Sequence, residues 1–321
     1  MVAAPFPAIV AGYFVIGFGF AVNLSTSNVF TANLRNGTTL LGFMHGSYGI
    51  GGIIGPLIAT KIVSTAGPDA WHRFYFLTIA IALSAGSFFA WSFWGYEREC
   101  ETAAGALPLT QTASGNGGGG TQTQPDETVT MLRAVKSRAV LLGAIFIFAY
   151  QGAEVSISGW VISFLIAARG GDPYAVGNVT SGFWGGITLG RFALSPLGAR
   201  IGEQRFVYAL IIGATVFQLL VWLVPNIIGE AVSLAIVGLL LGPIYPCATT
   251  VLARSLSYRK QVKGLSVISA FGSSGGAVAP FLTGLLIQVV GTFVLHPIVI
   301  ALFAVMMVCW FLLPSIRKRT E

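Results

Sequence analysis

Charged side chains are scarce in this sequence of 321 residues, because Asp, Glu, Lys and Arg together make up only 9% of it. Soluble domains commonly contain about 25% of these residues, which they need to cover a surface that faces water. Hydrophobic residues make up 55% of the chain, and the mean hydropathy is +0.79. The composition therefore excludes soluble domains of this size and indicates a polytopic membrane protein.

Cysteine and histidine are also scarce, with three residues of each type. Cys100, Cys247 and Cys309 are odd in number and far apart, so they indicate neither a disulfide framework nor a metal site. The sequence contains no Walker loop, no H-E-x-x-H zinc motif and no dinucleotide-binding fingerprint. Residues 272–276 fit the G-x-S-x-G pattern of serine hydrolases, but they lie in a long apolar stretch without the strand–turn–helix context of that motif. We expect neither an enzyme nor a bound cofactor or metal.

Apolar segments recur along the chain, each long enough to cross about 30 Å of hydrocarbon as a helix. Between the third and fourth of them, residues 96–138 are rich in Gly, Thr, Gln and charged residues, which is typical of a flexible linker. The sequence predicts an all-α polytopic membrane protein with about nine transmembrane helices. The predicted spans are residues 7–31, 40–63, 74–95, 139–168, 174–195, 206–225, 228–253, 262–290 and 296–314.

The basic residues predict how the chain is oriented in the lipid bilayer. With the C-terminus in the cytoplasm, 15 of the 18 Lys and Arg residues lie inside, and only Lys61, Arg73 and Arg169 lie outside. Such an excess on the cytoplasmic side is general in multi-pass proteins. The net charge of +7 forms no basic patch with interleaved aromatic residues, so we expect no nucleic-acid partner. We expect an integral membrane protein whose C-terminus and central linker are cytoplasmic.

An internal repeat predicts the domain organisation. Residues 51–56 (GGIIGP) are similar to residues 275–280 (GGAVAP), which lie 224 positions later, and a run rich in small residues precedes each. The first three spans therefore correspond to the last three, which is typical of a transporter built from two parallel six-helix halves. We expect an incomplete N-terminal half at 1–95, a linker at 96–138 and a six-helix C-terminal half at 139–321. The partners of the middle three spans would precede residue 1, so a second chain that completes these helices is a further expectation.

Six stretches, in order along nearly the whole chain, carry a resemblance to a known family. They are NLSTSNVFTANLRN at 23–36, GFMHGSYGIGGIIGPLIA at 42–59, YQGAEVSISGW at 150–160, LGRFALSPLGARIGEQR at 189–205, GLLLGPIYP at 238–246 and SAFGSSGGAVAP at 269–280. With these stretches the sequence resembles the major facilitator superfamily, and more narrowly its fucose-permease-like branch with fungal members. The resemblance implies secondary active transport of a small polar solute, a sugar, by alternating access. The alternative is a truncated, non-transporting membrane protein or a partner subunit.

Glu154 is the acidic residue that lies near the middle of an apolar segment, whereas the other ten lie in loops, in the tail or at a span edge. An ionised carboxylate at such a position costs roughly 2.5–3.5 kcal/mol on insertion scales. We predict that Glu154 binds and releases the proton that drives transport. The structural alternative is a hydrogen-bonded Glu that locks two helices together. Tyr150, Gln151 and Ser158 share its helix face, and this polar stripe suits a polyhydroxylated ligand or, alternatively, bonds between helices.

Further candidate substrate-binding residues lie in three other spans. Hydrogen bonds to a solute can come from the amides of Asn23 and Asn28 in the first span and from His45 and Tyr48 on one face of the second span. Tyr245, which lies between two prolines, offers a further hydroxyl. The bacterial sugar permeases that the sequence resembles have a carboxylate in the stretch that corresponds to the first span, and this chain has none. We expect Trp160 and Trp184 to serve in packing. With Tyr150 and Gln151, the predicted substrate-binding set is Asn23, Asn28, His45, Tyr48 and Tyr245.

The stretch from Gly190 to Arg205 resembles the cytoplasmic loop motif of the superfamily in its second-half copy. Its glycines allow a tight turn between two spans, and Arg191 at a helix end is placed to meet carbonyl oxygens and the negative end of the helix dipole. We predict that this loop gates the cytoplasmic side, although its charges alone would also set the orientation. The predicted gating residues are Gly190, Arg191, Arg200 and Arg205.

Overall fold

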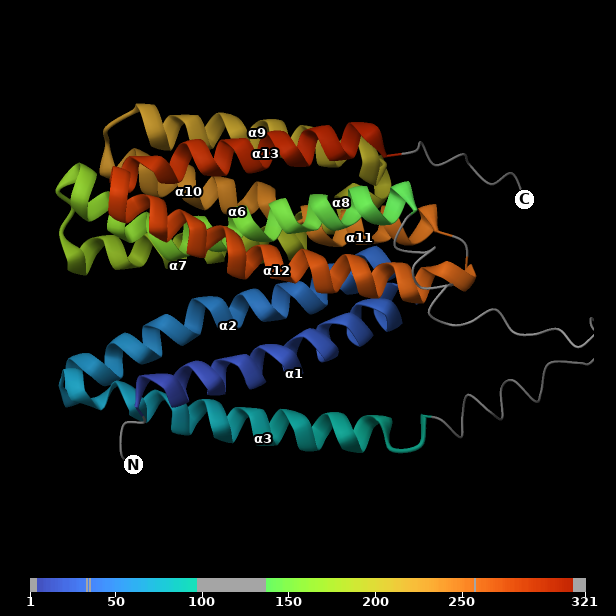
Figure 1. Cartoon of the computed structure of the whole chain (residues 1–321), viewed down its shortest axis with the longest axis horizontal. Helices are drawn as coiled ribbons and strands as arrows, with labels where there is room; N and C mark the ends of the chain where they lie inside the picture. Colours follow the sequence, from blue (N-terminus) through green and yellow to red (C-terminus); the bar gives the residue numbers. More distant parts are fainter. Residues whose placement is uncertain (1–4, 33, 35, 97–136, 257, 314–321) are drawn as a thin grey trace, which may run out of the picture. The chain divides into compact units, whose positions relative to one another are not determined.

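A computed structural model describes residues 5–32, 34, 36–96, 137–256 and 258–313, and the regular structure of these residues is entirely helical. Most of the predicted linker at 96–138 lies outside the described residues. Figure 1 labels the α-helices in chain order. They are α1 (Phe6–Ala32), α2 (Gly37–Ala66), α3 (Phe74–Phe93), α6 (Arg138–Arg169), α7 (Pro173–Leu189), α8 (Ser195–Ile201), α9 (Glu203–Leu223), α10 (Ile227–Leu241), α11 (Ile244–Ser255), α12 (Tyr258–Val290) and α13 (Leu295–Leu312).

Three shorter helical elements join these helices. The 3₁₀-helices η1 (Pro68–Arg73) and η4 (Thr292–Val294) precede α3 and α13. The element η3 (Gly190–Leu194) is a π-helical turn between α7 and α8. Because a π-turn accommodates an extra residue in a helix, it changes which side chains of the following turn face a neighbour.

The chain divides into two compact units. The smaller unit is Leu57–Asp126 with Met1–Ala3, and it contains the end of α2, η1 and α3. The larger unit is Ala4–Pro56 with Glu127–Glu321, and it contains α1, most of α2 and all helices from α6 onward. The three-part organisation expected from the repeat therefore stays a proposal about the architecture.

Seven helices of the described residues are long and apolar enough to cross a membrane. They confirm the prediction of an all-α polytopic membrane protein, and they match seven of the nine predicted spans. The segments predicted at 40–63 and 174–195 are also helical, but α2 is rich in glycine and α7 has only 17 residues before the π-turn. The seven are Phe6–Asn28, Phe74–Phe93, Arg138–Arg169, Glu203–Leu223, Ile227–Ser255, Lys263–Val290 and Thr292–Leu312.

The helix α6 forms the centre of the larger unit, packed against α12 and α13. It begins at the N-cap Ser137, whose side chain accepts a hydrogen bond from the backbone N–H of Val140, and it ends at Gly170 in the left-handed region (φ 66°). Its buried face carries Phe146, which packs on the indole of Trp310 with 4.9 Å between ring centroids. This packing fixes the rotation of α6 and thus the direction in which its polar residues point.

Four glycines bring α7 and η3 into backbone contact with α10. A side chain at Gly186 or Gly190 would collide with the main chain of α10, and one at Gly238 or Gly242 would collide with residues 183–191. Gly186 and Gly190 are four residues apart, as are Gly238 and Gly242, and this spacing is typical of small-residue contacts between membrane helices. The π-turn is therefore held directly against α10.

Candidate functional site

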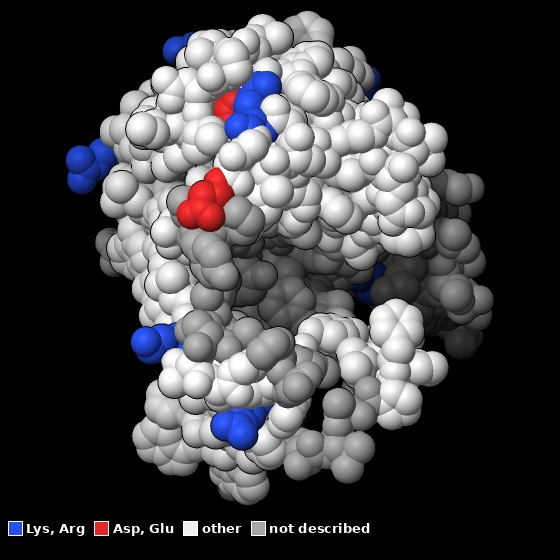
Figure 2. Space-filling model, turned by 90° about the vertical axis from the view of Figure 1, so that its left-hand side faces the viewer, with Lys and Arg blue, Asp and Glu red and all other residues white. Residues whose placement is uncertain are grey.

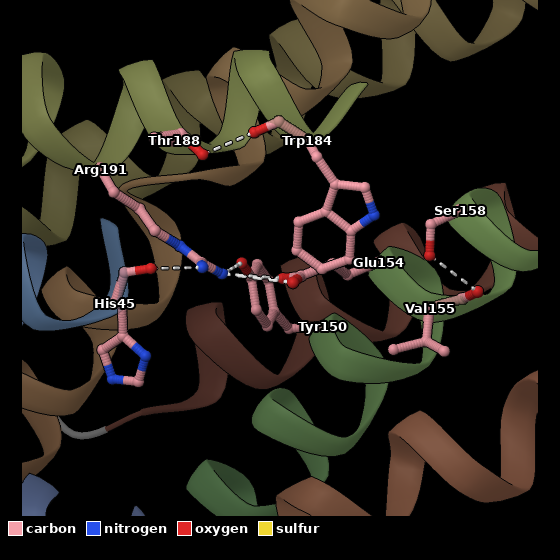
Figure 3. Close-up of polar contacts among 8 residues, drawn as sticks. All are labelled: His45, Tyr150, Glu154, Val155, Ser158, Trp184, Thr188 and Arg191. Atoms are coloured by element: carbon pink, nitrogen blue, oxygen red, sulfur yellow. Dashed lines mark hydrogen bonds and ion pairs between the residues drawn. The ribbon is translucent and has the colours of Figure 1, made fainter. Parts of the chain in front are cut away.

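Glu154 and Arg191 form an ion pair inside the larger unit. The terminal nitrogen Nη2 of Arg191 donates to both carboxylate oxygens of Glu154 at 3.2 Å, and each side chain is 3% exposed. The same nitrogen lies 3.3 Å from the hydroxyl of Tyr150, one helical turn before Glu154 on α6. Figure 3 shows these groups converging from α6 and η3. Breaking a buried pair by removing one partner typically costs about 3–5 kcal/mol, because the other charge stays buried.

The π-turn places Arg191 within this pair. Arg191 was expected at a helix end beside a tight turn, but the helical run continues through η3 into α8, and the turn falls at Gly202 (φ 106°). Its side chain thus lies in the interior of the protein. No feature of the sequence indicates the π-turn, which continues the helical run beyond the helix end predicted at Arg191. Its gating role stays a proposal.

A third contact of Arg191 reaches α2. Its Nη1 donates to the backbone carbonyl oxygen of His45 at 2.8 Å. Glycines of α2 make this approach possible, because a side chain at Gly42 would collide with the carbonyl of Arg191, and one at Gly46 would collide with the ring of Phe192. The Nε of Arg191 is buried and has no hydrogen-bond partner among the described residues.

Asn28, His45 and Tyr245 extend the network to α1 and α11. The imidazole Nε2 of His45 lies 3.0 Å from the amide oxygen of Asn28, and the amide nitrogen of Asn28 donates to the hydroxyl of Tyr245 at 2.9 Å. The rings of His45 and Tyr245 are 4.5 Å apart, and those of Tyr150 and Tyr245 are 5.9 Å apart. We call Asn28, His45, Tyr150, Glu154, Arg191 and Tyr245 the polar cluster.

All six members of the polar cluster are buried, with His45 the most exposed at 7%. The structure therefore brings together residues from α1, α2, α6, η3 and α11. Of the six residues, five are predicted solute- or proton-binding residues, and Arg191 is a predicted gating residue. A solute can reach them only when the surrounding helices separate.

Three predicted solute-binding residues lie outside the polar cluster. Asn23 is exposed, and its amide oxygen accepts a hydrogen bond from Ser27 at 3.4 Å. Gln151 is only partly buried, and its side chain makes no hydrogen bond within the described residues. Tyr48 is 53% exposed and packs edge-on against the ring of Trp184, with 6.0 Å between centroids. Their roles in binding stay proposals.

Trp184 of α7 packs against Tyr48 of α2, a contact that the sequence did not indicate. Figure 3 shows the hydroxyl of Ser158 turned away from Arg191, and this hydroxyl donates to the carbonyl of Val155. The expected stripe of four polar residues on α6 therefore divides, and only Tyr150 and Glu154 meet Arg191. The spacing of aromatic residues along α7 does not distinguish Trp184 from the other aromatic residues of this helix.

A second ion pair joins α9 and α11, close to the start of α2. The carboxylate of Glu203 accepts from Nη1 of Arg254 at 3.2 Å. The hydroxyl of Thr38 lies within hydrogen-bonding distance of both Glu203 (3.4 Å) and Thr250 (2.8 Å) and has one proton to donate to them. The predicted gating residues Arg200 and Arg205 flank this group in sequence. Both are exposed, and neither forms an ion pair with the described residues. Glu203 is not among the residues predicted from the sequence. The signal that could have indicated it is an acidic residue at the start of an apolar helix.

The part of the chain that the structure describes contains no group of three or more His, Cys, Asp or Glu side chains able to hold a metal ion. The polar cluster therefore offers hydrogen bonds and one ion pair rather than metal coordination.

The sequence profile of the Major Facilitator Superfamily matches residues 145–321, more than half of the chain. Bypass of stop codon protein 6 from Saccharomyces cerevisiae is 25% identical over 95% of this chain and 64% of its own length. The glucose/galactose transporter of Brucella abortus is 29% identical over 48% of this chain and 37% of its own length. The gallate transporter of Pseudomonas putida is 25% identical over 46% of this chain and 33% of its own length. The chain thus spans less than two thirds of these relatives.

The fold is similar to that of the fucose:proton symporter of E. coli. A solved structure of that protein superposes with a TM-score of 0.62 and 15% identity, over 91% of this chain and 73% of the symporter. The profile match confirms the resemblance to the superfamily that the six sequence stretches carry, and the solved structure agrees with it in fold.

Proposed function

Because the chain belongs to the major facilitator superfamily, a family of transporters and not of enzymes, we propose that this protein is a secondary transporter of a small polar solute. The solute is an uncharged sugar, a proton is cotransported, and the polar cluster binds both during an alternating-access cycle. The observation that carries the proposal is the buried Glu154–Arg191 pair with the adjacent unpartnered Nε of Arg191.

Glu154 is the proton-binding group in this proposal. When a proton binds the carboxylate, the charge opposite Arg191 disappears, and a buried guanidinium without a counter-charge is strongly unfavourable. A solute hydroxyl that accepts hydrogen bonds from Arg191 offsets part of this cost. Because each event favours the other, proton binding and solute binding become coupled.

The charge of the polar cluster favours an uncharged solute. Glu154 already neutralises Arg191, so an anion would have to displace the carboxylate before it could pair with the guanidinium. Asn28, His45 and Tyr245 supply further donors and acceptors at distances of 2.9–3.0 Å from one another. Such groups recognise hydroxyls, and a buried polar group left unpaired costs about 1–3 kcal/mol, which selects against solutes that lack them. The relative named as a glucose/galactose transporter supports a sugar over the aromatic acid of the gallate transporter.

The cytoplasmic gate is the second part of the proposal. Thr38 of α2 bonds to Glu203 and Thr250, so α2 meets α9 and α11 at this point. Gly190 holds η3 against α10, and Arg200 and Arg205 lie beside Glu203 in sequence. In this proposal the group closes the cytoplasmic side and opens when Arg191 leaves Glu154.

The test is uptake of labelled galactose into proteoliposomes with an imposed pH gradient. Uptake that rises with inward proton flow and is competed by glucose but not by gallate is the expected result. Competition by gallate alone would contradict the sugar assignment. Correctly inserted protein without any uptake would favour the alternative, a non-transporting protein or partner subunit.

A further inference from the structure

A surface pocket of about 1010 Å³ lies between the first turns of α7 and α10, about four helical turns of α6 away from Glu154. Its walls are mainly apolar: Val176, Val179 and Gly182 of α7 face Ile228, Ala231 and Val232 of α10. Figure 2 looks onto this end of the molecule and shows a surface with few charges, on which a basic side chain lies against an acidic one. The pocket is not part of the polar cluster.

The glycines of the two helices explain the shape of this pocket. Gly186 and Gly190 touch the α10 backbone near Gly238 and Gly242, so the helices meet there without intervening side chains. Toward the other ends of α7 and α10 no such glycine pairs occur among the pocket residues, and the helices leave an open groove. Gly182 has no atom within 4 Å of the position that a Cβ would occupy, so the groove is open at this point.

Apart from the exposed Asn178 of α7, the polar residues that line the groove lie at its rim. Arg169 is the last residue of α6, and Asn226 caps α10 by accepting from the backbone N–H groups of Ile228 and Gly229 at 3.1 Å. The Nδ2 donor of Asn226 is not used in that cap. Arg169 uses Nε for Glu230 and Nη2 for the carbonyl of Trp222, and Nη1 has no hydrogen bond within the described residues.

The depth of these groups matches the two regions of a bilayer leaflet. A candidate membrane span begins at Ile227, which would put Asn226 at headgroup level and Ala231 and Val232 about one turn deeper. Asp172 adds an acidic group to the rim, and Glu230 lies buried beside Arg169. The rim therefore offers both signs of charge without a net positive charge.

We propose that this groove binds one zwitterionic phospholipid from the bilayer. Its phosphate accepts hydrogen bonds from Nη1 of Arg169 and Nδ2 of Asn226, its ammonium lies toward Asp172, and one acyl chain occupies the apolar walls. An anionic lipid should bind less tightly than a zwitterionic one. Glu230 already offsets the positive charge of Arg169, and Asp172 would repel the negative headgroup. The proposal does not depend on the transport activity.

The test is native mass spectrometry of the full chain after equilibration with phosphatidylethanolamine or phosphatidylglycerol in mixed micelles. The variant Gly182→Leu fills the groove, and Gly185→Leu is its matched control on α7, because the Cβ position of Gly185 is equally open and Gly185 does not line the pocket. Wild type and Gly185→Leu should retain one phosphatidylethanolamine. In Gly182→Leu, affinity should fall about tenfold, which corresponds to about 1.4 kcal/mol.

A second variant tests the headgroup contact. Asn226→Asp keeps an oxygen that caps α10 but replaces the amide donor by a negative charge, so it should also weaken phosphatidylethanolamine binding. Equal retention in Gly182→Leu and Gly185→Leu would overturn the proposal. So would phosphatidylglycerol binding as tight as that of phosphatidylethanolamine, or displacement of the lipid by inorganic phosphate alone.

Discussion

The guanidinium of Arg191 lies 3.2 Å from both carboxylate oxygens of Glu154, although the two residues come from different helical elements, and each side chain is 3% exposed. The pair links α6 to the π-turn η3, and through the carbonyl of His45 it also links η3 to α2. Arg191 thereby connects α2 with α6 and η3, and its loss would release these elements together.

Arg191→Gln should destabilise the protein more than the double variant Glu154→Gln with Arg191→Gln. The single variant leaves a buried carboxylate without its partner and should lower the free energy of unfolding by about 3–5 kcal/mol. The double variant leaves no net charge buried, so part of the stability should return, with a coupling energy of about 0.5–3 kcal/mol. Denaturant unfolding in mixed micelles measures both. Strictly additive effects of the two substitutions would show that the pair does not stabilise the fold.

His45→Ala should impair solute binding while leaving the Arg191 contact in place. Arg191 bonds to the backbone carbonyl of His45, which the substitution retains, whereas the imidazole that meets Asn28 is lost. We expect KM for the solute to rise about tenfold or more, equivalent to at least about 1.4 kcal/mol, with a smaller change in kcat. Thr26→Ala, at an exposed position of α1 outside the predicted binding set, is the comparison and should leave KM unchanged. An unchanged KM in His45→Ala would remove His45 from the solute site.

Gly190→Ala should disturb the π-turn. An added methyl group would collide with the carbonyl oxygen of Leu239, and overpacking of this kind costs typically about 1–3 kcal/mol. Gly159→Ala on α6 is the control, because its Cβ position is open. There the higher helix propensity of alanine should raise stability by up to about 1 kcal/mol. Equal thermal shifts in both variants would contradict the close contact between η3 and α10.

Thr38→Val should loosen the proposed cytoplasmic gate. The substitution retains the shape of the side chain but removes the hydrogen bonds to Glu203 and Thr250. We expect faster labelling, by a membrane-permeant thiol reagent, of a reporter cysteine placed at Ala253, a buried position of α11. The same reporter in the Thr215→Val background, where the lost bond lies within α9 alone, should label at the wild-type rate. Equal labelling in both backgrounds would argue against a latch at Thr38.

The helices and the proton-binding candidate could be predicted from local sequence, whereas the arrangement around Arg191 could not. Apolar length alone predicts spans such as Glu203–Leu223, and an isolated acid in the middle of a span draws attention to Glu154. A π-turn depends on one additional residue in a helix and leaves no composition signal, so Arg191 was expected at a helix end. The bond between Asn28 and Tyr245 joins residues 217 positions apart, and no local pattern predicts such a contact.

Proton coupling through Glu154 is the central claim, and the variant Glu154→Gln tests it most directly. Uptake driven by a pH gradient and solute counterflow without a gradient are measured side by side in proteoliposomes. Glu230→Gln is the matched control, because Glu230 is also buried and paired with an arginine but lies outside the polar cluster. We predict that Glu154→Gln abolishes proton-driven uptake and retains counterflow, while Glu230→Gln retains both. Proton-driven uptake with unchanged pH dependence in Glu154→Gln would contradict the account.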